Sequence, residues 1–264
     1  MDHYALPPEQ FTAARDAAVT GAVAQQDRTL ATTLKALRKP SIAAMNDGLR
    51  AVEDHLTRLA PLHPRGSWLH GSLVLGGYHP GISDQDLVVE LDHPLTAKER
   101  ALVHSSHDQA GPMLATSYLE GKDDPEPWTW THGWCGRRRV SLITRAELHL
   151  AHPDDWPEVP DLPGVVAREV TQVWGPLLKL PWTWLKTEYV DLSLTSVARA
   201  LLTQETGELC TKDAALETLQ PLGVSPRLAE AVTARREGRQ ALPHNAFGRA
   251  VQTRNEVARL LEKL

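Results

Sequence analysis

The sequence predicts an α+β/α fold, in which a small mixed-sheet α+β domain is followed by an all-helical C-terminal bundle and preceded by a helical extension. Apolar residues recur every three or four positions before residue 60 and again after residue 164. Between these stretches, short apolar runs are separated by Gly, Pro and Asp, which is typical of strands. We therefore place the three parts at residues 1–60, 61–155 and 156–264.

The N-terminal extension is predicted to contain two helices. Residues 9–39 are rich in Ala and carry apolar side chains at helical spacing. Pro40 interrupts the pattern, and Ser41 is a suitable N-cap for a second amphipathic stretch that runs from Ile42 to Pro61.

The central part is predicted to form the sheet. Four short apolar runs are bounded by turn residues, and a helical segment at 96–109 separates the second run from the third. The predicted strands are residues 68–70, 87–91, 113–119 and 139–144.

A turn-rich connection precedes the C-terminal part. Residues 151–164 contain four prolines and four acidic residues, a composition typical of a domain boundary. Helical spacing dominates after it. The predicted helices are residues 164–180, 183–206, 212–220, 225–238 and 244–263.

The overall composition excludes several classes of protein. With 42% hydrophobic and 23% charged residues, the chain has the composition of a globular protein. Cys135 and Cys210 are its only cysteines and form no CxxC pair, which argues against a cysteine zinc site and favours a reducing compartment. No leader and no membrane-spanning apolar run is recognisable, so we expect a cytoplasmic protein without a membrane partner. A net charge of −5 argues against nucleic acid as a partner.

The stretch from residue 68 to residue 91 carries the most chemical information. A short apolar strand ends in Gly71-Ser72, a pair that can turn the chain tightly and present backbone N–H groups and a hydroxyl to a phosphate. Asp84 and Asp86 follow at the start of the next apolar run. The period of two in a strand places both carboxylates on one face, where they can hold a divalent cation such as Mg²⁺.

This order of features resembles the nucleotidyltransferase superfamily of the DNA polymerase β type. The shared features are His-Gly-Ser, the Gly76-Gly77 spacer and Ser-Asp-x-Asp-Leu, in that order on strand, turn and strand. The resemblance implies that Gly71 and Ser72 hold the outer phosphates of ATP. It also implies that Asp84 and Asp86 bind Mg²⁺ for transfer of a nucleotidyl group.

A second stretch, from residue 199 to residue 213, narrows the resemblance. Its Arg-to-Lys spacing, with Thr-Gly between, is similar to the ATP-contacting segment of aminoglycoside 3″-adenylyltransferases, which modify streptomycin and spectinomycin. The resemblance implies that Arg199 and Lys212 reach the triphosphate, where two cations would offset its charge.

The chain departs from that family at the third carboxylate. The family uses an acid on a later strand as metal ligand or general base, but the corresponding residue here is Ala115. Glu120, Asp123 or Asp124 at the end of that strand could substitute, and Glu120 is the nearest in sequence. Losing a general base typically costs about 10²- to 10⁴-fold in rate, so slow or absent transfer is an open alternative.

The acceptor is less well defined by the sequence. Trp128 or Trp130 falls near the position of the family's drug-stacking tryptophan, while Tyr189 stands where streptomycin-modifying members carry an acid. Together with Glu188 and Asp191, these tryptophans could form an aromatic and acidic pocket for a cationic sugar. Packing between domains is the alternative role for the same residues.

The sequence thus predicts an Mg²⁺-dependent enzyme that transfers an adenylyl group from ATP to a hydroxyl of a small molecule, such as an aminoglycoside-like compound. One alternative is a catalytically weak nucleotide-binding or regulatory homologue, because the third carboxylate is absent. Another is an enzyme that modifies a protein or a tRNA. The sequence leaves the oligomeric state and the nucleotide preference open.

Overall fold

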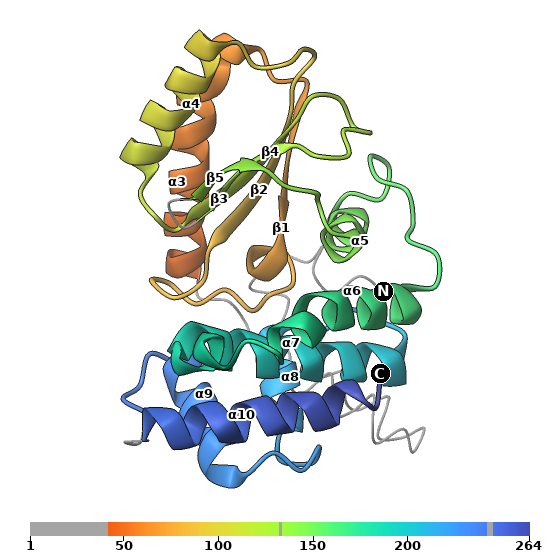
Figure 1. The fold of residues 1–264 in the computed structure, drawn as a ribbon. Helices are drawn as coiled ribbons and strands as arrows, with labels where there is room; N and C mark the ends of the chain where they lie inside the picture. Colours follow the sequence, from red (N-terminus) through yellow and green to blue (C-terminus); the bar gives the residue numbers. More distant parts are fainter. Residues whose placement is uncertain (1–41, 132–133, 242–244) are drawn as a thin grey trace. The chain divides into compact units, whose positions relative to one another are not determined.

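The computed structural model describes residues 42–131, 134–241 and 245–264. The predicted helix at 9–39, with Pro40 and Ser41, lies outside this range. The chain divides into two compact units, Met1–Glu158 and Val159–Leu264, and each is described by itself (Figure 1). No helix among the described residues is long and apolar enough to cross a membrane.

The first unit is built on a mixed five-stranded sheet with the order β1-β2-β3-β4-β5. Strand β2 pairs antiparallel with β1 and parallel with β3, and the remaining two pairings are antiparallel. The predicted strands at 68–70, 87–91 and 113–119 are confirmed to within a few residues. The strands are β1 (Gly66–His70), β2 (Gln85–Glu90), β3 (Leu114–Leu119), β4 (Trp128–Thr131) and β5 (Trp134–Arg137).

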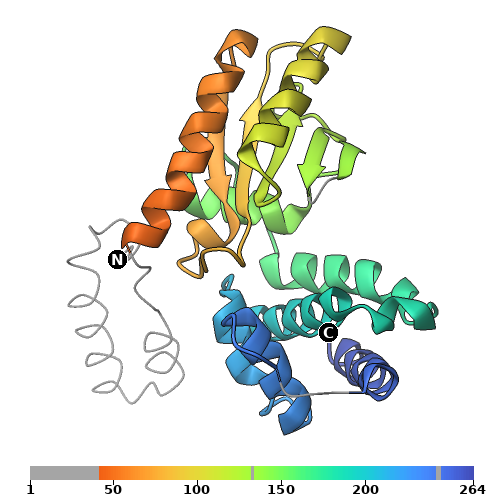
Figure 2. The same ribbon diagram turned by 90° about the vertical axis from the view of Figure 1, so that its left-hand side faces the viewer.

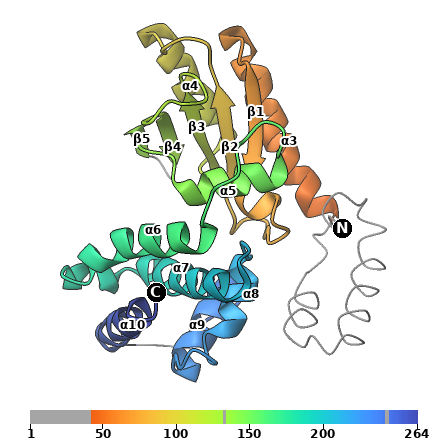
Figure 3. The same ribbon diagram turned by 90° about the vertical axis from the view of Figure 1, so that its right-hand side faces the viewer.

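Helices cover the two faces of this sheet differently. Helices α3 (Ile42–Leu59) and α4 (Ala97–Ala110) lie side by side on one face (Figure 2). The core beneath them includes Leu59, Leu87, Val103 and Tyr118. Helix α5 (Leu142–Ala151) packs on the other face near β1 (Figure 3). Its Leu148 joins a smaller apolar cluster with Trp68, Val88, Leu119, Val140 and Trp156.

Helix α4 confirms the helix predicted at 96–109, and its start has a local cause. The Thr96 hydroxyl accepts a hydrogen bond from the Glu99 backbone N–H, and the Glu99 carboxylate accepts one from the Thr96 backbone N–H. This reciprocal capping satisfies two backbone donors that the first turn of a helix leaves without partners.

The strand predicted at 139–144 is wrong. Ser141 instead caps helix α5, because its hydroxyl accepts a hydrogen bond from the Thr144 backbone N–H at 2.9 Å. The last two strands are β4 and β5, in the Trp-rich stretch that contains Trp128 and Trp130. Each is only four residues long, too short for alternation to stand out from the pattern of tryptophans.

The second unit is helical over its described residues, as predicted. Its core is formed by apolar residues of all five helices, among them the fully buried Val190 and Leu194 of α7 and Leu260 of α10. The predicted helix at 183–206 begins later, because a 3₁₀ turn (Pro181–Leu185) precedes it and buries Trp184. The helices are α6 (Leu162–Leu177), α7 (Thr187–Thr206), α8 (Lys212–Thr218), α9 (Pro226–Arg236) and α10 (Ala246–Leu261).

A chain of hydrogen bonds crosses the core between α3, α4 and β3. The Arg58 guanidinium donates to the Ser106 hydroxyl (3.1 Å), which lies 2.8 Å from His55 Nδ1. The Tyr118 hydroxyl lies 2.9 Å from His55 Nε2 and 2.8 Å from His107 Nε2. With Ser106 donating to His55 Nδ1, His55 Nε2–H donating to Tyr118 and Tyr118 donating to His107 Nε2, each of these contacts is satisfied and both imidazoles are neutral. Burial agrees with this, since it lowers the pKa of His55 to about 4 and that of His107 to about 3.

Candidate active site

The turn after β1 has a conformation that favours glycine. Gly71 has a φ of +67°, in the left-handed region that side chains rarely adopt. A single 3₁₀ turn (Gly71–Leu73) follows, closed by backbone bonds from Leu75 N to Gly71 O and from Gly77 N to Ser72 O. The sequence His70-Gly71-Ser72 therefore ends the strand and reverses the chain at once, which leaves the Ser72 hydroxyl at the strand's carboxyl end.

Gly71 also lies directly against the carboxylate of Asp86. A Cβ added at Gly71 would be 2.1 Å from Asp86 Oδ2, far inside van der Waals contact. Only a residue without a side chain allows this approach. The turn and the aspartate that the sequence singled out, fifteen positions apart, are thus in contact.

Asp84 and Asp86 occupy the start of β2 as predicted. Asp84 immediately precedes the strand and Asp86 is its second residue, so the period of two places them on one face about 7 Å apart at their Cα atoms. The Ser72 hydroxyl donates a long hydrogen bond (3.5 Å) to the Asp84 backbone carbonyl. The structure therefore brings four of the predicted site residues together: Gly71, Ser72, Asp84 and Asp86.

These residues fit a magnesium ion. Among the described residues, no group of three or more His, Cys, Asp or Glu side chains is arranged to hold a metal. Mg²⁺, however, is usually bound through one or two carboxylates with the rest of its shell from water and substrate phosphates. Two carboxylates beside a phosphate-sized turn meet that requirement.

The row of residues across the sheet at Asp86 shows what surrounds the carboxylate. His70 is its partner on β1 and Ala115 its partner on β3. The residue next to Asp86 on the following strand therefore presents only a methyl group, at the position where the resemblance expects an acid.

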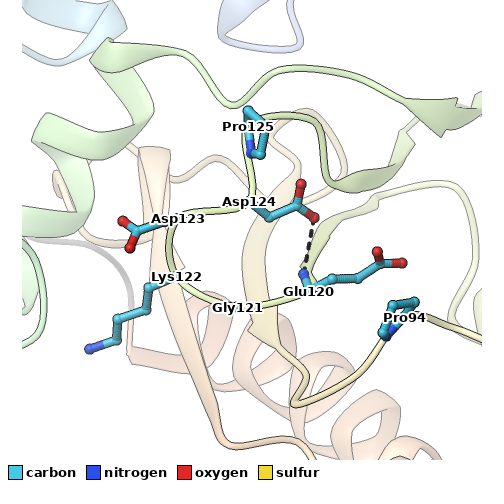
Figure 4. A pocket seen from close by; sticks show the side chains of 7 residues that line it. All are labelled: Pro94, Glu120, Gly121, Lys122, Asp123, Asp124 and Pro125. Atoms are coloured by element: carbon cyan, nitrogen blue, oxygen red, sulfur yellow. Dashed lines mark hydrogen bonds between the residues drawn. The ribbon is translucent and has the colours of Figure 1, made fainter.

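Glu120 does not fill that role. The parallel register pairs Glu90 with Leu119, so Glu120 is five residues beyond Ala115, about 16 Å along the strand. Its carboxylate accepts hydrogen bonds from the Arg137 guanidinium at 2.7 Å and the Leu95 backbone N–H at 3.3 Å. Glu120 lines a separate hollow of about 400 Å³ together with Asp123 and Asp124, and Figure 4 shows these side chains. The predicted substitution by any of these acids is corrected, because the sheet register places them at the opposite end of β3.

Trp128 and Trp130 lie on the other face of the sheet from Asp86. Trp130 pairs with Thr116 and Trp128 with Tyr118, residues of the face that α4 covers. The Arg100 and Arg137 guanidiniums lie over the Trp128 ring, at 4.7 and 5.2 Å from its centroid. The imidazole of His107 stacks on Trp130 at 4.7 Å and an angle of 7°. The predicted stacking of these tryptophans on a ligand beside Asp86 is therefore corrected, and their packing within the domain explains them.

Trp134 is an aromatic residue near the site that was not predicted from the sequence. It pairs with Thr131 on β4, and the register of β3 with β4 places Thr131 opposite Ala115. Trp134 therefore belongs to the row and the face of Asp86, about 14 Å from it across three strand spacings. Its side chain is 45% exposed. Trp128, Trp130 and Trp134 are all at even positions, so only the strand pairing separates Trp134 from the other two.

His70 and Glu147 form a buried pair beside this row. Glu147 Oε2 lies 3.3 Å from His70 Nδ1, and the two side chains are 8% and 13% exposed. Burial by itself lowers the pKa of His70, but the hydrogen bond with Glu147 and the negative charges of Asp86 and Glu147 outweigh it and raise that pKa. Glu147 comes from α5, so an acid does reach this side of the sheet, from a helix instead of a strand.

Arg199 and Lys212 belong to the second unit. The Arg199 guanidinium donates to the Cys210 backbone carbonyl at 2.9 Å, two residues before Lys212. Lys212 is the first residue of α8, whose N-cap is Thr211. The structure therefore brings Arg199 close to the segment that carries Lys212, as the sequence spacing suggested.

Glu188 and Asp191 lie three residues apart on α7, in different surroundings. Glu188 is exposed in the first turn. Asp191 binds the Arg235 guanidinium through both carboxylate oxygens. Burial raises the pKa of Asp191 despite this pairing. The Asp191 carboxylate therefore already holds a cation of this chain, whereas Glu188 is open to solvent.

Comparison with known proteins supports the fold. No protein-family model matches the sequence, and no curated protein matches it significantly. A solved structure does share the architecture: spectinomycin adenyltransferase AAD(9) from Enterococcus faecialis, crystallised with ATP and spectinomycin. The TM-score is 0.59 at 15% sequence identity, over 81% of this chain and 99% of that one. At this identity the similarity establishes a nucleotidyltransferase-like fold across both units.

Proposed function

We propose that the protein transfers an adenylyl group from ATP to a hydroxyl of a small acceptor, in the presence of Mg²⁺. The observation that carries the proposal is the contact between the Gly71-Ser72 turn and the Asp86 carboxylate. It brings the turn that we propose to bind phosphate next to the carboxylates that we propose to bind the metal, at the end of β1 and the start of β2. The solved structure with the same fold contains ATP, which supports the choice of nucleotide.

Each residue of the candidate site has a separate role in the proposed reaction. The turn and the Ser72 hydroxyl bind the outer phosphates, while Asp84 and Asp86 hold the cation. An Mg²⁺ ion, when bound there, supplies positive charge to the phosphate oxygens. The acceptor hydroxyl loses its proton to solvent as its oxygen forms a bond to the α-phosphorus. The bond between the α-phosphorus and the oxygen that bridges to the β-phosphate breaks, and pyrophosphate leaves. The proposal that Arg199 and Lys212 of the second unit offset the charge of the pyrophosphate rests on the resemblance alone.

The acceptor is proposed to lie over the face of the sheet that carries Asp86. Trp134 presents an exposed ring in the row of Asp86, which suits a flat or cationic molecule. For the second unit, the prediction that Glu188 binds a cationic group of the acceptor rests on the sequence alone. These features, and the spectinomycin in the solved structure with the same fold, favour an aminoglycoside-like compound over a macromolecule.

The test is removal of the two carboxylates. We expect Asp84→Asn with Asp86→Asn to abolish Mg²⁺-dependent ATP binding in calorimetry, because no second pair of acids lies beside the turn among the described residues. The control is Asp123→Asn with Asp154→Asn, two exposed acids whose loss changes the net charge equally. Unchanged ATP affinity in the first variant would show that the site is wrongly assigned.

A second candidate function is nucleotide binding without efficient transfer. Ala115 beside Asp86 favours it, because the position lacks a proton acceptor. Pyrophosphate release in the presence of a panel of aminoglycosides and spectinomycin separates the two functions. Tight ATP binding without release would support the second candidate, and label passing from ATP to a macromolecule in a cell lysate would indicate a protein or tRNA acceptor.

A further inference from the structure

Glu147 is a buried acid on α5 that has no role in the proposed reaction. Its side chain is 8% exposed, and burying a carboxylate is costly unless hydrogen bonds compensate it. Leu148, the next residue, packs into the apolar cluster beneath α5. His152, at the end of α5, lies with Nε2 3.1 Å from the Leu69 carbonyl. Helix α5 is thus fixed to β1 without the carboxylate, so packing alone does not require an acid at residue 147.

The partner of Glu147 is placed at the junction of the candidate site. His70, bound through Nδ1 at 3.3 Å, is the last residue of β1 and the cross-strand partner of Asp86. It also precedes Gly71, against which the Asp86 carboxylate lies. Glu147 thus contacts His70, and His70 is the cross-strand neighbour of Asp86 on the same face of the sheet.

We infer that Glu147 is a positioning residue of the metal site, which acts through the His70 ring to fix the Asp86 carboxylate against the Gly71 turn. This inference rests on the proposed function, because it assigns a role at the same site. Groups that hold a ligating side chain from behind typically contribute about 10- to 100-fold in metal affinity or activity. In this role the Glu147–His70 pair supports the Asp86 carboxylate from the side of β1, whereas Ala115 on β3 presents only a methyl group.

The experiment measures Mn²⁺ binding by electron paramagnetic resonance in the presence of a non-hydrolysable ATP analogue. The variants are Glu147→Gln, His70→Asn and the double variant, with Asp84→Asn plus Asp86→Asn as the reference for a lost site. The matched control is His152→Ala, which removes the contact of His152 Nε2 with the Leu69 carbonyl at the end of α5. Urea unfolding of each variant separates loss of fold from loss of metal.

We expect Glu147→Gln and His70→Asn each to weaken Mn²⁺ binding about 10- to 100-fold, and the double variant to be little worse than either, because the two act as one unit. His152→Ala should stay within about twofold. If Glu147→Gln matches His152→Ala while the double aspartate variant loses Mn²⁺, the inference is overturned and the proposed function stands. If the double aspartate variant binds Mn²⁺ normally, both fail.

Discussion

The two faces of the sheet use the same residue types for opposite purposes. On the face of α5, His70 lies beside the candidate site, and the negative charges of Glu147 and Asp86 raise its pKa. On the face of α3 and α4, His55 and His107 are buried and share one tyrosine hydroxyl, and their pKa values are lowered. The comparison shows that the partner, and not the residue type, decides whether an imidazole carries charge.

The tryptophans follow the same division. On the face of α3 and α4, the imidazole of His107 stacks on Trp130 and His104 contacts it edge-on. Trp134 lies on the face that carries Asp86 and is exposed. The two are four residues apart in a Trp-rich stretch and belong to neighbouring strands. One stabilises the fold, and the other is available to a ligand.

The largest effect on ligand binding is expected from Gly71→Ala, beside the Asp86 carboxylate. The added methyl group would lie 2.1 Å from Asp86 Oδ2, so we expect loss of Mg²⁺-dependent ATP binding in calorimetry. Gly81→Ala is the matched control, because Gly81 has a similar φ of +72° but a Cβ added there would have nothing within 4 Å. Both variants bear the same backbone strain. Equal ATP affinities in the two would contradict the role of the Gly71–Asp86 contact.

The two buried histidines on the face of α3 and α4 should lower the free energy of unfolding at acid pH. The unfolded chain binds protons at His55 and His107 below pH 6.5, whereas the folded chain does so only below about 4 and about 3. Between these limits the unfolded state binds more protons, so the unfolding free energy falls as pH falls, by about 2–4 kcal/mol from pH 7.5 to 5. Urea unfolding across this range measures it.

A variant assigns this dependence to the buried imidazoles. His107→Gln removes one titrating group and should reduce the pH slope by about half. A slope that persists in full in His107→Gln would mean that other groups cause it.

The smallest expected effect separates the tryptophans. We expect Trp134→Ala to raise the acceptor KM about five- to tenfold, corresponding to roughly 1 kcal/mol of stacking, with an unfolding free energy within about 0.5 kcal/mol of wild type. Trp130→Ala should show the reverse, a lower unfolding free energy with the acceptor KM unchanged. Steady-state kinetics and urea unfolding on both variants measure the difference, and matching effects would refute the division of the two faces.

Much of the fold was predictable because its signals are local. Thr96 and Glu99 form a capping box within four residues, and the apolar spacing of α7 spans five turns. Strands β4 and β5 were not predictable in the same way. Each has four residues, and their alternation is hidden by tryptophans on both faces.

The candidate site divides along the same line. Neighbours within a strand or a turn were enough to predict the turn at Gly71-Ser72, the aspartates at 84 and 86 and the lack of an acid at Ala115. The folded chain was needed to see that Glu120 is remote from Asp86, that Trp134 and not Trp130 shares the face of Asp86, and that Glu147 contacts His70. Those relations depend on strand register and on helix packing, where a shift of one residue moves a side chain to the other face of the sheet.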